Sequence, residues 1–330
     1  MKELPLLNQD TLSGEVTFVV IGKNEAKILP RCFSSILKLT DNIIFVDSDS
    51  TDNSVGIAKE FGIKKIIRVK ANYHSASLAR SVGADDVYTK YIQFLDGDME
   101  LETDWISYGL NYLENNKRVA TVNGYKKVYN HDFKNFFIHS DKKDWQPDYL
   151  GGAFLIRNRI YREVGGFDIR FHGEEERDLY VRLRDKGYQV WYLHKLMSSH
   201  YDFKTNNYWY ILFSGIEAGM WVSLLKSIKN RRIKSYIFVY RTLLIPLLCE
   251  ITTFALLLFG IKIFLLYGSL IQVFELLYCS IIKRPGYFLI WKGAILSIKK
   301  SYQILKRKVS YNKEYINIAK KSFEINNNTH

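Results

Sequence analysis

The sequence predicts an α/β protein built on a mostly parallel, twisted, doubly wound sheet. Through the first hundred residues, short apolar and β-branched runs alternate with segments of helical period. Several of these runs end directly in acidic residues, which is typical of strands that meet a ligand at the carboxyl edge of an open sheet. The chain has 330 residues, enough for one large domain or two ordinary ones.

The first half of the sheet follows from the chain in order. The run at 16–22 is rich in Val and Ile, as expected of a buried parallel strand. The next turn leads into an amphipathic helix, and the same alternation then repeats. The predicted elements are a strand at 16–22, a helix ending near 39, a strand at 42–46, a helix at 55–61, a strand at 65–69, a helix at 76–87 and a strand at 91–96.

The last of these strands runs into two carboxylates, Asp96 and Asp98, separated by Gly97. Two acids at a strand end can share one divalent cation, and Mg²⁺ or Mn²⁺ prefers oxygen ligands while keeping positions open for substrate phosphates. For an isolated pair of this kind, a simple turn with solvated acids is the more ordinary interpretation. The metal hypothesis therefore depends on the other motifs.

Other strand ends carry similar chemistry. Asp47 can accept an N–H from a pyrimidine base, whereas Asp49 and Asp52 are better explained by local turn and cap bonds. Arg80, on a predicted helix, can offset pyrophosphate charge, although a lone helix arginine is usually a surface residue. The sequence lacks G-x-G-x-x-G after the first strand and lacks a P-loop motif, which disfavours dinucleotide oxidoreduction and P-loop hydrolysis.

The middle of the chain adds two glycines and a second acidic cluster. Gly151 and Gly152 precede an apolar run, where a ligand or another backbone can approach closely. Residues 174–176 are three successive glutamates at the start of a predicted helix. Acids there are stabilised by the helix dipole, and the same position also suits a general base.

In their order and spacing, over about residues 14–203, these motifs resemble those of the family 2 glycosyltransferases. The resemblance implies a GT-A fold and inverting transfer of a sugar from a nucleotide-diphosphate donor. The matching motifs are Asn24-Glu25, Asp47-Ser48-Asp49-Ser50-Thr51-Asp52, Arg80, Asp96-Gly97-Asp98, Gly151-Gly152, Gly165-Gly166-Phe167-Asp168 and Glu175-Glu176-Arg177-Asp178.

The resemblance also implies roles for individual residues. Asp47 would bind the base, Arg80 the diphosphate, and Asp98 the metal, which would be Mg²⁺ or Mn²⁺. His200 matches a position where some relatives have a metal-binding histidine. The donor-binding set is Asn24, Glu25, Asp47, Arg80, Asp96 and Asp98; the metal set is Asp98, Asp96 and His200; the acceptor-binding set is Gly151 and Gly152.

The catalytic base is implied in the same way. The family usually has Glu-Asp at this position, with the Asp as the base, and here Glu175-Glu176 takes its place. Glu176 would therefore be the base. Because a glutamate replaces the aspartate, Glu175 remains a competitor for that role.

Charge and composition point to a membrane rather than to nucleic acid. Residues 201–330 contain 19 Lys and Arg against six Asp and Glu, so they hold the whole net charge of +13. A neutral α/β half joined to a basic, apolar half favours a membrane surface. Three widely spaced cysteines predict neither a disulfide framework nor a zinc site and fit a reducing compartment. Residues 1–10 lack the apolar stretch of a secretion signal.

The basic half contains two apolar runs of 20 residues, 242–261 and 263–282, interrupted only by Glu250 and Glu275. Twenty helical residues span about 30 Å, the thickness of a bilayer core. Basic residues flank the outer ends, so a helical hairpin would have both ends on the cytoplasmic side. A soluble helical domain, or two helices lying in the interface, is the alternative. Residues 287–308 predict a basic amphipathic helix suited to an anionic surface.

Together these features predict a membrane-attached glycosyltransferase whose catalytic domain faces the cytoplasm. It would use a nucleotide-sugar donor and a lipid-linked saccharide acceptor in cell-surface glycan biosynthesis, with no nucleic-acid partner. A polyprenyl-phosphate sugar transferase and a degenerate, non-catalytic sugar-binding subunit are the alternatives. The predicted domains are an extension at 1–13, a catalytic domain at 14–225, a transmembrane or interfacial hairpin at 226–285, and a basic helix and tail at 286–330.

Overall fold

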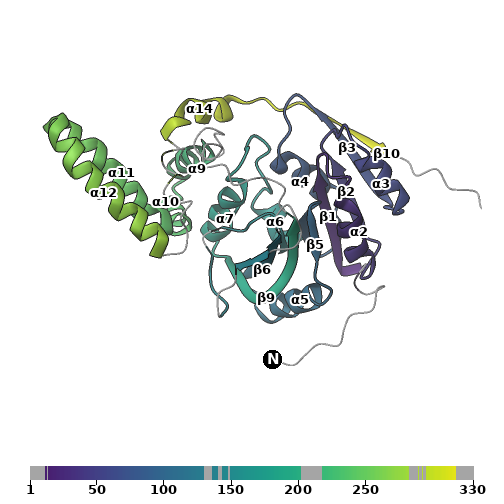
Figure 1. The fold of residues 1–330 in the computed structure, drawn as a ribbon. Coiled ribbons are helices and arrows are strands. Elements are labelled where there is room, and N and C mark those ends of the chain that lie inside the picture. The colour runs from purple at the N-terminus through teal and green to yellow at the C-terminus, as the bar shows by residue number, and fades with distance from the viewer. Residues whose placement is uncertain are drawn as a thin grey trace, which may run out of the picture.

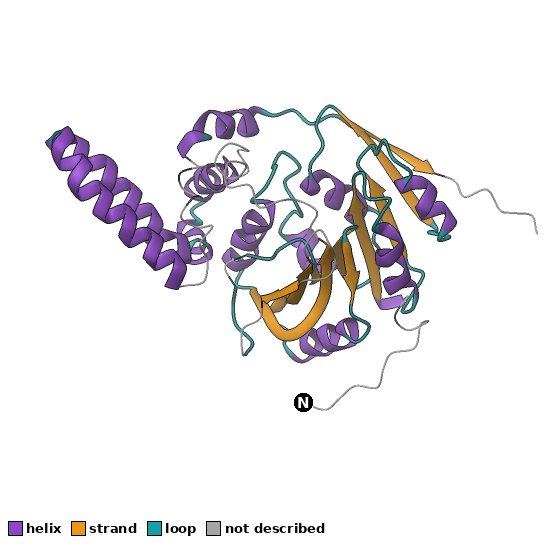
Figure 2. Ribbon diagram, in the orientation of Figure 1, coloured by secondary structure: helices purple, strands orange, loops and turns teal. Residues whose placement is uncertain are grey.

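The computed structural model describes residues 12, 14–129, 136–139, 143–147, 149–201, 218–281, 289, 292 and 295–316. The described part contains a twisted sheet of ten strands flanked by helices, from which a pair of long helices projects (Figures 1 and 2). The α/β fold expected from the sequence is confirmed. Most of the predicted extension at 1–13, residues 202–217 of the predicted catalytic domain and the predicted tail from 317 lie outside the described residues.

The strands run in the order β10-β3-β2-β1-β4-β8-β6-β9-β5, with β7 paired to β6. They are β1 (Val16–Gly22), β2 (Ile43–Asp47), β3 (Lys65–Ala71), β4 (Tyr91–Asp96), β5 (Met99–Leu101), β6 (Val119–Tyr129), β7 (Phe136–His139), β8 (Phe154–Arg157), β9 (Gln189–Tyr201) and β10 (Tyr311–Ile316).

The first four strands in sequence pair in parallel, as predicted, and β6 and β9 form a further parallel pair. In the register of the first four strands, Gly22 lies opposite Asp47 and Ile21 lies opposite Asp96. The two acids therefore flank the end of β1 at one edge. Antiparallel pairs join β4 to β8, β8 to β6, β5 to β9 and β10 to β3, so the sheet as a whole is mixed.

Helices cover both faces of the sheet and separate the core into two layers. One layer packs α4, α6 and α7 against the sheet, and the other packs α2, α3 and α5 against the opposite face. These helices are α2 (Leu29–Leu37), α3 (Ser54–Glu60), α4 (Ala76–Asp85), α5 (Trp105–Asn115), α6 (Asn158–Glu163) and α7 (Glu175–Asp185). Helix α2 follows the expected turn after β1, in which Asn24 has a left-handed backbone (φ 58°).

The described residues from 218 onward form helices, followed by β10. Its elements are α9 (Ala218–Lys229), α10 (Ile233–Val239), η1 (Arg241–Leu243), α11 (Leu244–Ala255), η2 (Leu256–Phe259), α12 (Ile261–Ile281) and α14 (Ile298–Lys306). Helices α11 and α12 form the predicted hairpin and project from the domain (Figure 1). The chain then returns. Ser301 of α14 donates a hydrogen bond to the carbonyl of Ala218 (3.0 Å), and β10 pairs with the edge of β3.

Gly83 lies where α4 packs closely against the sheet. A Cβ at this position would lie 2.4 Å from Val19 Cγ1 and 3.0 Å from Val46 Cγ2. We expect Gly83→Ala to lower the free energy of unfolding by about 1–3 kcal/mol, because overpacking outweighs the better helix propensity of alanine. Urea unfolding measures this. Gly14→Ala is the control, since its Cβ would meet nothing within 4 Å; an unchanged midpoint for Gly83→Ala would contradict the close packing.

Candidate active site

A cavity of about 450 Å³ opens at the carboxyl edge of the parallel strands. Its lining includes four residues that the sequence singled out, and these come from the ends of β1 and β4 and from α4. They are Glu25, Arg80, Asp96 and Asp98. The cavity therefore lies where open α/β sheets bind ligands, outside the carboxyl ends of their strands.

Arg80 is the centre of this cavity wall. Its side chain is only 3% exposed, and its Nη2 donates to Asp96 Oδ1 at 2.8 Å. Its Nη1 donates to Glu175 Oε1 at 3.0 Å and to Glu176 Oε1 at 2.9 Å. One guanidinium thus joins the strand-end acid to both glutamates of α7. Because carboxylates bind both terminal nitrogens of Arg80, the guanidinium holds these carboxylates in position.

At the start of α7, the side chain of Glu174 has different partners from those of Glu175 and Glu176. Glu174 has a left-handed backbone (φ 63°), and its carboxylate accepts from Arg177 Nη1 (2.6 Å) and from the Tyr240 hydroxyl (2.9 Å). Glu175 and Glu176 instead reach Arg80. The turn at Glu174 therefore directs the next two carboxylates into the site while its own side chain holds the helix against α10.

Glu176 has the properties expected of a proton acceptor. Burial, followed by the negative charge of Glu175, raises the pKa of Glu176 to about 7, although Arg80 acts in the opposite direction. General acid–base catalysis is most efficient when the pKa of the group lies near the working pH. This position can therefore accept a proton near neutrality.

Asp98 and His200 form the part of the site that could hold a metal. The pairing of β5 with β9 places His200 opposite Met99, and His200 Nε2 lies 3.2 Å from Asp98 Oδ2. Asp98 Oδ1 is buried and has no hydrogen-bond partner among the described residues. An open carboxylate oxygen beside an imidazole fits Mn²⁺ or Mg²⁺.

The described residues supply only part of a metal ion's ligands. In the part of the chain that the structure describes, no group of three His, Cys, Asp or Glu is arranged around a common point. Asp96, the third predicted ligand, gives one oxygen to Arg80. The residues therefore fit a cation that takes its remaining ligands from substrate phosphates, as Mg²⁺ commonly does.

Glycines allow the walls of the site to approach one another. A Cβ on Gly152 would lie 2.0 Å from Asp96 Oδ2, and a Cβ on Gly97 would lie 2.3 Å from Glu25 Oε2. Gly151 has a φ of 77°, which disfavours other residues. A side chain at position 152 would therefore collide with Asp96. The acceptor role of both glycines stays a prediction.

Asn24 and Asp47 occupy the neighbouring strand ends. The Oδ1 of Asn24 accepts from the Thr51 N–H (2.8 Å), which ties the loop after β1 to the loop after β2. Asp47 is fully buried, and its Oδ2 accepts from the Ser50 N–H at 3.0 Å and lies 3.3 Å from Arg68 Nε. Its Oδ1 has no partner among the described residues. Asp47 therefore keeps one acceptor oxygen available.

Asp52 makes the local bonds that the simpler interpretation expects. Its Oδ1 accepts from the Ser54 N–H (2.9 Å), and its Oδ2 accepts from the Ala26 N–H (3.0 Å). Ser54 Oγ in turn accepts from the Glu25 N–H (3.0 Å). Asp52 thereby fixes the loop that presents Glu25 to the cavity.

Three lining residues, Lys23, His74 and His172, were not singled out from the sequence. Lys23 directly follows β1, and His74 precedes Ser75, whose Oγ accepts from the Leu78 N–H (3.2 Å) and caps α4. Their only sequence signal is position, immediately after a strand or before a helix. Such positions are also ordinary loop residues, so the pattern does not distinguish them.

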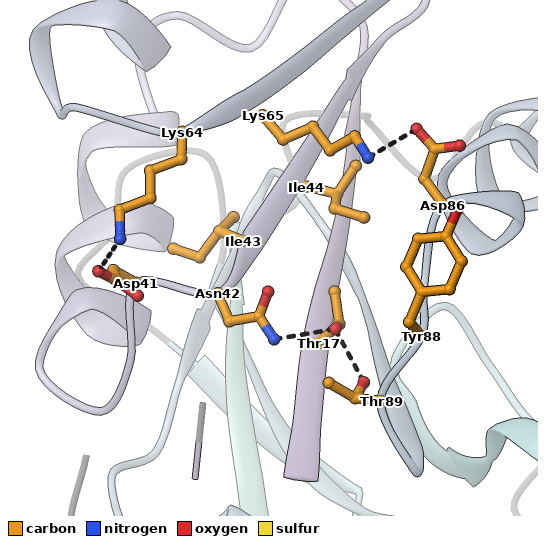
Figure 3. Close-up of a pocket in the computed structure, with 10 residues that line it drawn as sticks. All are labelled: Thr17, Asp41, Asn42, Ile43, Ile44, Lys64, Lys65, Asp86, Tyr88 and Thr89. Atoms are coloured by element: carbon orange, nitrogen blue, oxygen red, sulfur yellow. Dashed lines mark hydrogen bonds and ion pairs between the residues drawn. The ribbon is translucent and has the colours of Figure 1, made fainter. Parts of the chain in front are cut away.

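A second cavity, of about 350 Å³, lies at the opposite edge of the sheet, at the amino ends of β1 and β2 (Figure 3). Its charged side chains pair with one another: Lys65 lies 2.9 Å from Asp86, and Lys64 bonds Asp41. A cavity whose charges are already paired, at the amino edge of the strands, lacks the features of a ligand site in this class of sheet.

The substitution Arg80→Met tests the ion pairs that Arg80 makes with Asp96, Glu175 and Glu176. Removing the guanidinium leaves three carboxylates without their shared cation, so we expect a loss of about 3–5 kcal/mol in the free energy of unfolding near neutral pH. In the variant, the guanidinium no longer offsets the repulsion between these carboxylates, and its loss removes the charge that lowers the pKa of Glu176. The deficit should therefore shrink as the pH falls and they become protonated.

Urea unfolding above and below neutrality measures this dependence. Arg159→Met is the control, because Arg159 is exposed and should change the free energy of unfolding by less than about 0.5 kcal/mol. A deficit for Arg80→Met that is the same at both pH values would show that lost packing, rather than charge pairing, explains it.

Sequence comparison relates the N-terminal half of the chain to a known family. Residues 17–171 match the sequence model of glycosyl transferase family 2. An uncharacterized glycosyltransferase from Rickettsia conorii is 25% identical over 185 residues, which is 47% of this chain and 64% of that protein. Glycosyltransferase GlyA from Streptococcus pneumoniae is 28% identical over 170 residues, or 50% of this chain and 23% of that protein. The matches thus span less than two thirds of either relative.

Solved structures agree on the fold. A mannosyltransferase from Pyrobaculum calidifontis, in complex with GDP-Man and Mn²⁺, superposes with a TM-score of 0.59 over 87% of each chain, at 15% identity. TarS from S. aureus (residues 1–349) gives 0.51 over 68% of this chain and 71% of that one, at 12% identity. Residues 17–171 thus match glycosyl transferase family 2, and the mixed sheet has the GT-A fold.

Proposed function

We propose that this protein transfers a sugar from a nucleotide-diphosphate donor to a hydroxyl acceptor, with inversion at the anomeric carbon and with Mg²⁺ or Mn²⁺ as cofactor. The observation that carries the proposal is the Arg80 cluster, which joins Asp96 of β4 to Glu175 and Glu176 of α7. Related folds were solved with GDP-Man and Mn²⁺, and with UDP-GlcNAc, which supports a nucleotide-sugar donor here.

The donor would occupy the carboxyl edge of the parallel strands. Asp47 keeps a buried oxygen that can accept a base N–H, and Glu25 and Asp96 line the adjoining cavity. A cation held by Asp98 and His200, when bound, supplies positive charge that offsets the charge developing on the leaving nucleotide. Asn24 keeps the loops after β1 and β2 in register with each other.

The acceptor would approach from the side of α7. Glu176 takes the proton of the acceptor hydroxyl as that oxygen forms a bond to the anomeric carbon. The bond from that carbon to the diphosphate oxygen breaks on the opposite face, so a single displacement inverts the centre. Arg80 keeps the glutamate beside the donor, and Glu175, which shares the same Nη1, is the alternative base.

Glu176→Gln should lower turnover by about 10²–10⁴-fold in a folded protein, because the amide keeps the side-chain size but cannot accept the proton. Steady-state transfer rates measured with a panel of nucleotide sugars, with and without Mn²⁺, report this. Turnover that persists in Glu176→Gln but disappears in Glu175→Gln would assign the base to Glu175.

Asp98→Ala separates binding from proton transfer in the same assay. It should also abolish transfer, but through loss of Mn²⁺-dependent donor binding, which calorimetry detects directly. Glu60→Gln, an exposed change on α3, is the matched control. Metal-dependent donor binding without any turnover in the unmodified protein would support the non-catalytic alternative.

The hairpin supports a membrane-bound acceptor. Within the described residues, 261–280 of α12 are long and apolar enough to cross a bilayer, and α10 with residues 241–255 passes the same test as a bent pair. Large apolar side chains on the hairpin are exposed, including Leu258 at 88% and Leu266 at 61%. We propose that the hairpin enters the membrane with both ends on the cytoplasmic side.

A catalytic domain held there would reach lipid-linked saccharides, which we propose as acceptors in cell-surface glycan synthesis. A polyprenyl phosphate is the alternative acceptor. Transfer to this acceptor would have less need of a strong general base, because a phosphate monoester is already ionised. Parallel assays with a lipid phosphate and a lipid-linked saccharide separate the two.

The double change Leu258→Asp and Leu266→Asp tests the membrane role. A carboxylate in the bilayer core costs about 2.5–3.5 kcal/mol, so the variant should lose most of its binding to phosphatidylcholine vesicles in flotation. Nucleotide binding should be unchanged. Tyr88→Asp, at a residue 90% exposed beside the second cavity, is the control; flotation of both variants at the level of the unmodified protein would exclude insertion of the hairpin.

A further inference from the structure

A third cavity, of about 440 Å³, lies at the base of the hairpin. It is formed where the C-terminal end of α7 and the start of β9 meet the first turn of α10, and α10 lies beside both α7 and the hairpin base in Figure 1. Neither the donor cavity nor the catalytic glutamates belong to it. The residues that line it include Gln146, Arg184, Tyr188, Gln189, Lys234 and Ser235.

The cavity carries two positively charged side chains, Arg184 and Lys234. In the described part of the chain, no carboxylate forms an ion pair with Arg184 or Lys234. Asp185, the acid next to Arg184, lies 3.0 Å from Arg232 and is paired with it. The cavity is thus positively charged, and its other lining groups are amides and hydroxyls.

Stacking holds the guanidinium of Arg184 in place. Its Cζ lies 3.2 Å from the centre of the Phe238 ring, and the Cζ of Arg241 lies 4.2 Å from the same ring. Arg241 also donates to the Gln146 carbonyl (2.7 Å), which fixes one wall of the cavity. A stacked guanidinium keeps its N–H groups in one plane, directed at whatever lies beside the ring.

The position of the cavity relative to the hairpin indicates how far the cavity lies from the membrane. Helix α10 meets the segment 241–255 at 70°, so α10 lies close to the membrane plane when α11 enters the bilayer. Two apolar side chains of α10, Ile233 and Ile237, are 38% and 46% exposed. If the hairpin is inserted as proposed above, on which this step rests, the cavity lies at the level of the lipid phosphates.

We propose that this cavity binds the phosphate of an anionic lipid headgroup. Arg184 can bind two phosphate oxygens with its planar fork, and Lys234 adds a point charge. Gln189 and Ser235 can bond the hydroxyls or ester oxygens of the headgroup. Because α7 has its glutamates at one end and Arg184 near the other, about 14 Å along the helix, a lipid bound here sets the height of the active site above the bilayer.

The test uses the full-length protein and a soluble short-chain lipid, dihexanoylphosphatidic acid, titrated by calorimetry. The unmodified protein should bind it saturably, and Arg184→Gln/Lys234→Gln should bind it at least about tenfold more weakly. The control, Lys299→Gln/Lys300→Gln on α14, removes the same charge from another exposed basic surface and should leave binding within about twofold.

Three results would overturn the proposal. The first is that the unmodified protein shows no saturable binding. The second is an equal loss of lipid binding in both double variants, which would indicate diffuse electrostatic attraction. The third is that inorganic phosphate binds as tightly as the lipid, which would indicate a site for free anions. Flotation on phosphatidylcholine vesicles and the transfer assay report on the hairpin and the catalytic site separately. Both should be unchanged in Arg184→Gln/Lys234→Gln, so failure of the lipid site is distinguishable from failure of the proposed function.

Discussion

The site depends on a buried guanidinium that must be matched by carboxylates. Burying an unpaired charge is very costly, so Arg80 requires acids close to both of its terminal nitrogens. Those acids come from a strand end and from the first turn of a helix far along the chain. The cluster therefore fixes α7 against the parallel strands, and it explains why Gly152 has no room for a side chain beside Asp96.

The parallel half of the fold was predictable because buried strands are short, β-branched and followed by acids; the bounds of β1 and β4 agree with those expected. The left-handed conformation of Asn24 was not, since the turn expected after β1 does not specify it. Strand β10 was missed for another reason. Its sequence, Tyr-Asn-Lys-Glu-Tyr-Ile, is largely polar, and its partner β3 lies far away in sequence.

The candidate site was predictable to a similar extent. Acids at the carboxyl ends of parallel strands share an edge of the sheet, so Asp47 and Asp96 could be assigned to one edge from sequence alone. The partners of Arg80 could not, because an arginine on an amphipathic helix carries no sign of which distant carboxylates it will meet. Lys23, His74 and His172 line the cavity from loops, where residue type and position are weakly coupled.

The pairing of β10 with β3 has a consequence for biosynthesis. Asn312 lies opposite Lys70, so the edge of β3 waits for about 240 further residues to be made. At about 5–20 residues per second, this takes roughly 12–48 s. During that interval the nascent domain has an open sheet edge while the apolar hairpin leaves the ribosome. Early capture of the hairpin by a bilayer would hold the unfinished domain apart from its neighbours until its last strand arrives.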